Sequence, residues 1–366
     1  MSVTPCARIC QALVATLRCR FAIGGVLLSM LTLTAIAALI VIAPIDRPLS
    51  LCDAPGAVAV DSVTHRLYLS MFSSEEVLAL DEASQAPLGG VPLAGTASSL
   101  AVNSATGRLY AGVPNAVAVL AGATNTLLGT VTLGKMPTAI AVNPATNRIY
   151  VTTELVGRNR SHDSVEVLDG FADSVVGEIP VGLEPRGVAV NPLSNRVYVA
   201  NFADGTVSVL DGATDAVLAT IPVGKSPVHL DLNPVTNRVF VVARDDNSLM
   251  VLDGASNTVV ATVPLATVPG VVAVNARTNR VYVAGHFGAV TVLDGATNRV
   301  LTNLVLPGEP SEVAADPDSN HIYVTTAVEN TVWLIQDHRF GLPSARVVAT
   351  SARVIRDYGS GGCMCP

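Results

Sequence analysis

The chain has 366 residues, of which half are hydrophobic, 4% are aromatic and 14% are charged, against about 25% charged in ordinary soluble domains. Such a chain is too apolar to be disordered, and it is longer than one hydrophobic core usually serves unless the fold is modular, a barrel or a propeller. The formal charge is −7, and lysine occurs only at Lys135 and Lys225. This composition argues against nucleic acid as a partner, because no broad basic surface can form.

The N-terminal residues predict a membrane anchor. Residues 21–43 contain no charge, and as a helix they would span roughly 35 Å, enough to cross a hydrocarbon layer of about 30 Å. Arg8, Arg18 and Arg20 precede this run, and no acid does, so residues 1–20 should stay in the cytoplasm and the chain after residue 44 should be exported. We predict a single-pass protein of the inner (cytoplasmic) membrane, with its main domain on the periplasmic or extracellular side. A cleaved signal peptide is the alternative, but the run exceeds the usual apolar core of about 7–15 residues.

One phrase then recurs seven times, as in AVNPATNRIYVT from Ala141 and AVNPLSNRVYVA from Ala189. Each copy contains one acid or amide at the same place, which we call the anchor residue, and successive anchors are 40 to 48 residues apart. The anchors are Asp61, Asn103, Asn143, Asn191, Asn233, Asn275 and Asp316. Each repeat holds four short runs rich in Val and Ile, bounded by Asn, Asp, Gly and Pro, and no run has helical length and period. The pattern predicts an all-β, seven-bladed β-propeller of four-stranded blades over residues 44–355, followed by a Gly/Cys-rich tail at 356–366.

The repeats resemble the bacterial YVTN β-propeller family. Tyr150–Thr153 reads YVTT and Tyr198–Asn201 reads YVAN, and the likeness covers residue 49 to about residue 350. The resemblance implies the fold and a general scaffold rather than one activity. Seven-bladed relatives also resemble lactonases and the β-subunits of periplasmic dehydrogenases, which makes an enzyme the alternative function. The WD40 pattern is absent, since Trp333 is the single tryptophan.

The repeated polar residues are expected to serve the fold. Asn and Asp cap tight turns and Gly supplies positive φ, and a catalytic group is needed once rather than in every blade. The turns between the first and second strands (A and B) and between the third and fourth (C and D) should share one face. His65 and His321 fall in the A–B turns, and we assign them to that face.

Departures from the repeat are where a binding site is expected. The innermost strand carries a small Ala in six repeats, because the blades converge there, but blade five has Asp231 at this position and His229 two residues earlier. Blade seven has Glu312 at the position of His229. We predict a ligand site at the axial funnel formed by these three residues with Arg186. No HxH, HExxH, GxSxG or phosphate-loop motif occurs, so no catalytic residue, metal or cofactor is assigned.

The spacing of 48 residues marks an insertion in the B–C loop of blade three. The inserted loop carries Arg158, Arg160 and His162, and two interpretations are open. It is a lip over the axial pocket that contacts an anionic ligand, or it is a solvated insertion without a role.

Two segments could complete the last blade, and both should lie near blade seven. They are Leu49–Leu51, which align with the end of a fourth strand, and residues 346–350. This placement would bring Cys52 near Cys363 and Cys365 and predicts a disulfide from Cys52 to one of them in the exported compartment. A tail with free or mutually oxidised thiols is the alternative.

Taken together, these features favour a membrane-anchored, non-catalytic propeller of the cell envelope. It would bind an envelope protein, a glycan or a small ligand at the loop face or the axial funnel.

Overall fold

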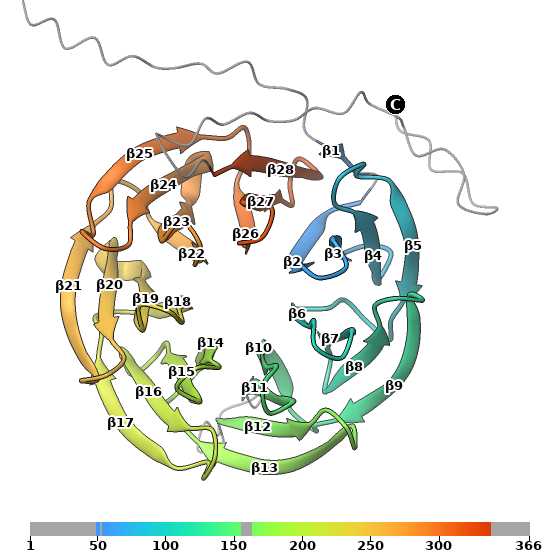
Figure 1. The fold of residues 1–366 in the computed structure, drawn as a ribbon, viewed down its shortest axis with the longest axis horizontal. Coiled ribbons are helices and arrows are strands. Elements are labelled where there is room, and N and C mark those ends of the chain that lie inside the picture. The colour runs from blue at the N-terminus through green and yellow to red at the C-terminus, as the bar shows by residue number, and fades with distance from the viewer. Residues whose placement is uncertain (1–48, 52, 155–162, 338–366) are drawn as a thin grey trace, which may run out of the picture. The chain divides into compact units, whose positions relative to one another are not determined.

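The computed structural model describes residues 49–337, except residue 52 and residues 155–162. These residues form seven four-stranded antiparallel sheets, arranged as blades around a common axis (Figure 1). The predicted seven-bladed β-propeller is therefore confirmed. Among the described residues no helix is long and apolar enough to span a bilayer, and the predicted anchor at residues 21–43 lies outside them.

Each of the first six blades takes four consecutive strands, A to D, from the axis outwards. Blades one to three comprise β2 (Pro55–Asp61), β3 (Arg66–Met71), β4 (Glu76–Asp81) and β5 (Pro87–Pro92); β6 (Ser99–Asn103), β7 (Arg108–Val113), β8 (Ala116–Ala121) and β9 (Thr126–Thr132); and β10 (Met136–Asn143), β11 (Arg148–Glu154), β12 (Ser164–Asp169) and β13 (Ser174–Pro180). Blades four to six comprise β14 (Pro185–Asn191), β15 (Arg196–Asn201), β16 (Thr206–Asp211) and β17 (Val217–Pro222); β18 (Pro227–Asn233), β19 (Arg238–Ala243), β20 (Ser248–Asp253) and β21 (Thr258–Pro264); and β22 (Pro269–Asn275), β23 (Arg280–Gly285), β24 (Ala289–Asp294) and β25 (Val300–Val305). Two single 3₁₀ turns, η1 (Arg244–Asp246) and η2 (His286–Gly288), lie in the B–C loops of blades five and six.

Blade seven combines both ends of the described chain. It contains β26 (Pro310–Asp316), β27 (His321–Thr326) and β28 (Thr331–Gln336), and its outermost strand is β1 (Leu49–Ser50). β1 runs antiparallel to β28, with Leu49 opposite Val332. The prediction that the segment from Leu49 closes the ring is confirmed, whereas residues 346–350 lie outside the described residues.

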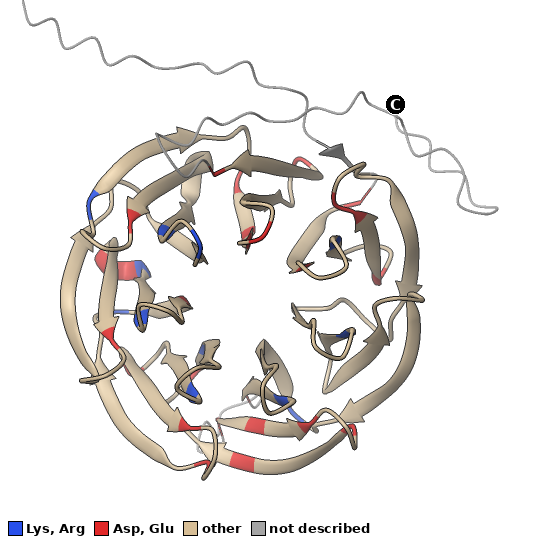
Figure 2. Cartoon of the chain, viewed as in Figure 1, with Lys and Arg blue, Asp and Glu red and all other residues tan. Residues whose placement is uncertain are grey.

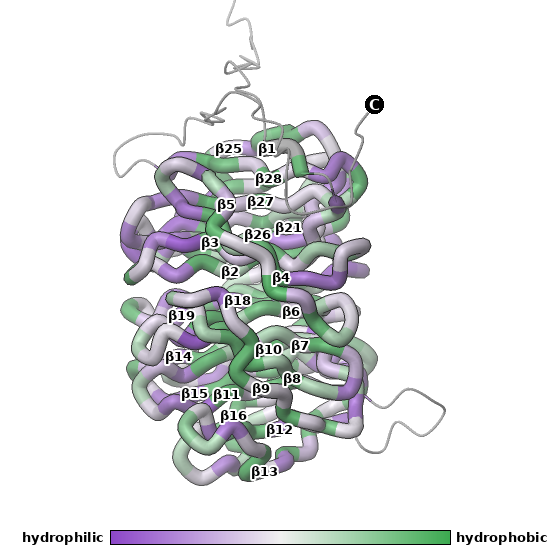
Figure 3. The backbone as a smooth tube through the Cα atoms, turned by 90° about the vertical axis from the view of Figure 1, so that its right-hand side faces the viewer, coloured by the Kyte–Doolittle hydropathy of each residue, from purple (hydrophilic) through white to green (hydrophobic). Residues whose placement is uncertain are grey.

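The hydrophobic core is divided among the boundaries between blades. The second and third strands of each blade bury apolar side chains on both faces, and the buried side chains form one cluster between every two neighbouring blades. Figure 3 shows hydrophobic stretches along the strands and hydrophilic stretches at many of the turns. Charged residues correspondingly gather at the strand ends, and the bands on β12 and β13 in Figure 2 are exceptions. Stability therefore depends on each blade having two neighbours, which requires a closed ring.

The A–B and C–D turns form one face, which we call the turn face. There the anchor amide Asn103 donates from Nδ2 to Oδ1 of Asn147 in the next blade, at 2.6 Å. Asn147 has a left-handed backbone (φ 54°), and a Cβ added at Gly170 would come within 2.5 Å of its Oδ1. Arg108 also reaches the next blade and donates to the carbonyl of Gly170 at 2.8 Å. The repeated Asn, Arg and Gly thus join neighbouring blades, in agreement with the expectation that they stabilise the fold.

The D–A and B–C loops form the opposite face, which we call the loop face. Asp204 and Asp246, both in B–C loops, accept hydrogen bonds from D–A loop amides, those of Leu183 at 2.8 Å and Lys225 at 2.7 Å. These acids hold the loops together and are not free ligand groups.

Candidate functional site at the axis and on the loop face

The axial site consists of three side chains on the inner strands. His229 and Asp231 lie on β18, and Glu312 lies on β26. Nδ1 of His229 accepts from the amide of Val272 at 3.3 Å, and Oδ2 of Asp231 accepts from the amide of Val274 at 2.8 Å. Both amides belong to β22, the inner strand of blade six, which has no further strand beside it. Blade five therefore satisfies polar groups of an open sheet edge in blade six.

His229 also faces Glu312 across blade six. Nε2 of His229 is 3.6 Å from Oε1 of Glu312. Because Nδ1 accepts the Val272 amide, the neutral ring carries its proton on Nε2, on the side of the glutamate. The structure thus brings together the three axial residues predicted from the repeat's exceptions.

Asp231 has an altered acidity. Burial raises the pKa of its carboxyl to about 6, although hydrogen bonds from the amides of Leu232 and Val274 oppose the rise. A carboxyl that changes charge near neutrality is a feature of ligand sites and catalytic sites. In this position it can accept or donate a hydrogen bond to a polar ligand at the axis.

The remaining predicted ligand residues are not joined to this group. The guanidinium of Arg186 lies over the ring of Phe202, 4.4 Å from its centroid, and 3.4 Å from a carboxylate oxygen of Glu184. Arg158, Arg160 and His162 lie outside the described residues, as do Cys52, Cys363 and Cys365. The roles proposed for these residues stay predictions.

A group of apolar side chains on the loop face was not predicted from the sequence. Phe72, Phe287 and Val328 are 65%, 81% and 80% exposed, and they lie in the B–C loops of blades one, six and seven, which are consecutive around the ring. Phe287 has a left-handed backbone (φ 61°), which is rare for a bulky residue and points to a functional constraint. The signal in the sequence was a large apolar residue one or two positions after strand B.

A cluster of His and acidic side chains on the turn face was not predicted from the sequence either. His65, Glu82 and Asp316 place three potential ligand atoms within 4.8 Å of one another, the only such group among the described residues. Burial by itself would raise the pKa of Glu82, but hydrogen bonds from His321, Ser319 and His65 outweigh it and lower that pKa. Glu82 is therefore ionised in the fold.

The comparisons with known proteins support the fold class alone. The chain matches no known family model and no curated protein sequence. It is similar in structure to hydrazine synthase of Kuenenia stuttgartiensis, with a TM-score of 0.68 and 19% identity over 78% of this chain and 96% of that one. It is similarly related to U3-55K, with a TM-score of 0.67 and 16% identity over 82% of this chain and 94% of that one. At such identities the likeness defines a β-propeller and no activity.

Proposed function

We propose that this chain is a membrane-anchored, non-catalytic β-propeller of the YVTN repeat type, which binds a protein partner in the bacterial cell envelope. The observation that carries the proposal is the group of exposed apolar side chains Phe72, Phe287 and Val328 on the loop face. We call this group the apolar loop patch. Anchoring rests on residues 21–43 and the arginines before them.

Phe72, one member of the apolar loop patch, lacks the cover that the aligned residue of blade four has. Phe202 and Phe72 are each the first residue after strand B, but Phe202 is covered by the guanidinium of Arg186. In blade one the residue aligned with Arg186 is Gly56, so Phe72 has no such cover. Large apolar side chains on loops of a rigid scaffold are typical of protein-binding surfaces.

The axial group supports binding better than catalysis. His229 contacts the Val272 amide and Glu312, and within the described residues no Ser, Thr or Cys side chain is hydrogen-bonded to it. The pairing of a nucleophile with a base, on which acyl-transfer hydrolases depend, is therefore missing there. The axial residues are suited to anchor a polar group of a ligand or partner.

A site-specific cross-linking experiment tests the proposal. The full-length chain is produced in membranes with a photoreactive residue at position 72 or 287, and matched controls carry it at position 171. Phe171 is also exposed, at 78%, but lies in a C–D turn on the turn face. We expect a discrete protein adduct from positions 72 and 287. Adding Phe287→Asp to the chain with the photoreactive residue at position 72 should abolish the adduct, whereas adding Phe171→Asp should not.

Two results would contradict the proposal. Adducts formed equally at positions 72, 171 and 287 would show that the loop face is not selective. Adducts to glycan or to no macromolecule, together with turnover that is lost in His229→Ala, would support the enzyme alternative.

A further inference from the structure

The boundary between blades seven and one, which we call the closure seam, does not use the polar link that recurs around the ring. At the five boundaries from blade two to blade seven, an anchor Asn bonds a turn Asn of the next blade. At two of them an Arg also reaches the carbonyl of a Gly in the next blade, as Arg108 and Arg148 do. At the closure seam the anchor is Asp316, the turn residue is His65, the Arg is replaced by His321 and the Gly by Glu82. Four departures from the repeat therefore coincide at one place.

These residues converge on the carboxylate of Glu82. Nδ1 of His65 lies 3.0 Å from one oxygen, and Nδ1 of His321 lies 3.1 Å from the other. The hydroxyl of Tyr323 is 3.0 Å from this second oxygen. His65 and Glu82 come from the two turns of blade one, whereas His321 and Tyr323 come from β27 of blade seven.

The substitutions are sterically matched. In blades three to six a Cβ at the Gly position would come too close to the turn Asn, as at Gly170 and Asn147. Blade one lacks that Asn, because His65 takes its place with the same left-handed backbone (φ 54°). His65 and Glu82 thus together replace the Asn and Gly of those blades, and both belong to the turns of blade one.

The hydroxyl of Ser319 lies between the two carboxylates of the cluster. Oγ of Ser319 lies 2.6 Å from Glu82 and 2.8 Å from Oδ2 of Asp316. A serine hydroxyl has one hydrogen to donate, so it can satisfy only one of the two carboxylates. Glu82 and Asp316 are both buried, and a positive charge beside two buried carboxylates, from a bound cation or a protonated histidine, offsets their repulsion.

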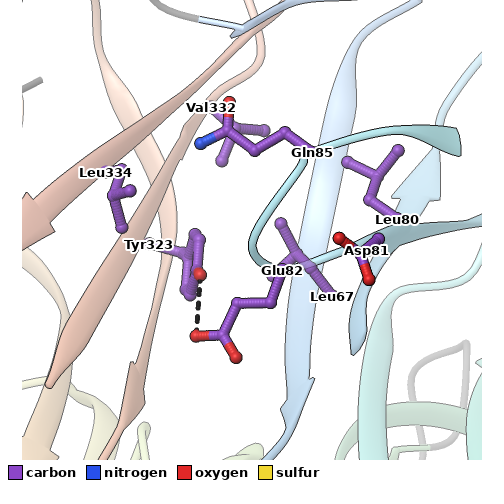
Figure 4. Close-up of a pocket in the computed structure, with 8 residues that line it drawn as sticks. All are labelled: Leu67, Leu80, Asp81, Glu82, Gln85, Tyr323, Val332 and Leu334. Atoms are coloured by element: carbon purple, nitrogen blue, oxygen red, sulfur yellow. Dashed lines mark hydrogen bonds between the residues drawn. The ribbon is translucent and has the colours of Figure 1, made fainter. Parts of the chain in front are cut away.

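A small cavity adjoins the cluster. Figure 4 shows Glu82 beside this cavity, which is lined by Leu67, Leu80 and Leu334 together with polar side chains such as Gln85 and Tyr323 and has room for about one water molecule. The apolar part of this lining lowers the local dielectric and strengthens charge pairing. His65 is exposed, so an ion can reach the cluster from solvent.

We propose that His65, Glu82 and Asp316 form a binding site for one divalent transition-metal ion of the Zn²⁺ class, which locks the closure seam. Imidazole nitrogen with carboxylate oxygen is a donor set that suits Zn²⁺, whereas Ca²⁺ and Mg²⁺ prefer oxygen alone. A water molecule would complete the tetrahedron. Ser319 and Tyr323 orient the carboxylates from outside.

The test is a zinc titration of the full-length chain in detergent, with its cysteines alkylated beforehand to remove thiol binding. The matched control restores the residues that recur in the other blades by His65→Asn, Glu82→Gly and Asp316→Asn, a combination that the repeat itself shows to be foldable. We expect one Zn²⁺ more per wild-type chain than per control chain, and Co²⁺ should give a tetrahedral visible spectrum only with the wild type. Zn²⁺ should also raise the midpoint of thermal unfolding of the wild type alone.

A second variant keeps the proposal testable if the triple substitution does not fold. Glu82→Gln retains the shape of the side chain, and it should weaken zinc binding by at least about tenfold. Equal zinc stoichiometry in the wild type and the variants would overturn the proposal and leave the cluster as a proton-compensated contact between blades.

Discussion

At the scale of single residues, chemistry is concentrated where a blade departs from its repeat. Asp231 replaces an alanine beside the axis, and its carboxyl spans two backbone amides of the inner strands. Its pKa of about 6 lies above the ordinary value of 3.8 because the carboxyl is buried. Compared with the unfolded chain, the fold therefore favours the protonated, neutral form of the Asp231 carboxyl.

This preference predicts how stability changes with pH. Because the pKa is raised in the fold, the contribution of Asp231 is fully present below about pH 4 and is lost as the pH rises through about 6. The shift corresponds to at most about 3 kcal/mol. The free energy of unfolding of the wild type should fall across this window, and Asp231→Asn should remove that part of the fall, as measured by urea unfolding at a series of pH values.

Asp211 provides the control for this measurement. It ends β16 at the turn face, and amide hydrogen bonds lower the pKa of its carboxyl, so Asp211→Asn should leave the slope above pH 4 unchanged. An identical slope in the wild type and Asp231→Asn would show that Asp231 is already ionised in the fold at low pH.

At the scale of elements, ring closure depends on a very short strand. β1 contributes two residues to the sheet, and the amide of Leu51 adds a hydrogen bond to the carbonyl of Asn330 at 2.8 Å. The side chain of Leu51 is buried between blades one and seven, in a cluster with Val58 and Val332. Packing of this side chain therefore supplements the few hydrogen bonds of β1.

We expect Leu51→Ala to lower the free energy of unfolding by about 2 kcal/mol or more, because it leaves a cavity in a closed core. Val63→Ala is the matched control, since Val63 is 69% exposed and surface changes usually stay within about 0.5 kcal/mol. Denaturant unfolding of the full-length chain measures both. A change at Leu51 no larger than that at Val63 would mean that β1 does not hold the ring.

At the scale of the whole molecule, the proposed anchor and the closing strand are neighbours in sequence, with only residues 44–48 between residue 43 and β1. The closing strand is therefore the first part of the propeller to follow the proposed membrane segment.

Topology can be tested with an impermeant maleimide on intact spheroplasts. A full-length variant carries Phe171→Cys on the turn face and Ser at positions 52, 363 and 365. We expect labelling at position 171, while Cys6, Cys10 and Cys19 react only after lysis and serve as the internal control. Labelling of these three cysteines in intact spheroplasts would reverse the proposed orientation.

Much of the architecture could be predicted because its information is local. Every blade repeats the same runs of Val and Ile and the same turn residues, so seven anchors predict seven blades and the alignment of Leu49–Leu51 predicts the closing strand. The axial group could be predicted for a related reason. Asp231 stands out against six alanines, and His229 and Glu312 share a repeat position that holds a small or apolar residue in the other five blades. Equivalent positions of the blades lie around the same axis.

The cluster of His65, Glu82 and Asp316 at the closure seam and the apolar loop patch could be recognised only from the tertiary structure. Glu82 and Ser319 are 237 residues apart, and His65 and His321 look like ordinary turn residues when each blade is considered alone. The ring places the last blade beside the first, so a contact between them has no counterpart in local sequence. The exposure of a side chain likewise depends on the residues packed against it. Phe72 and Phe202 share one position in the repeat, and only the packing of Arg186 on Phe202 distinguishes them.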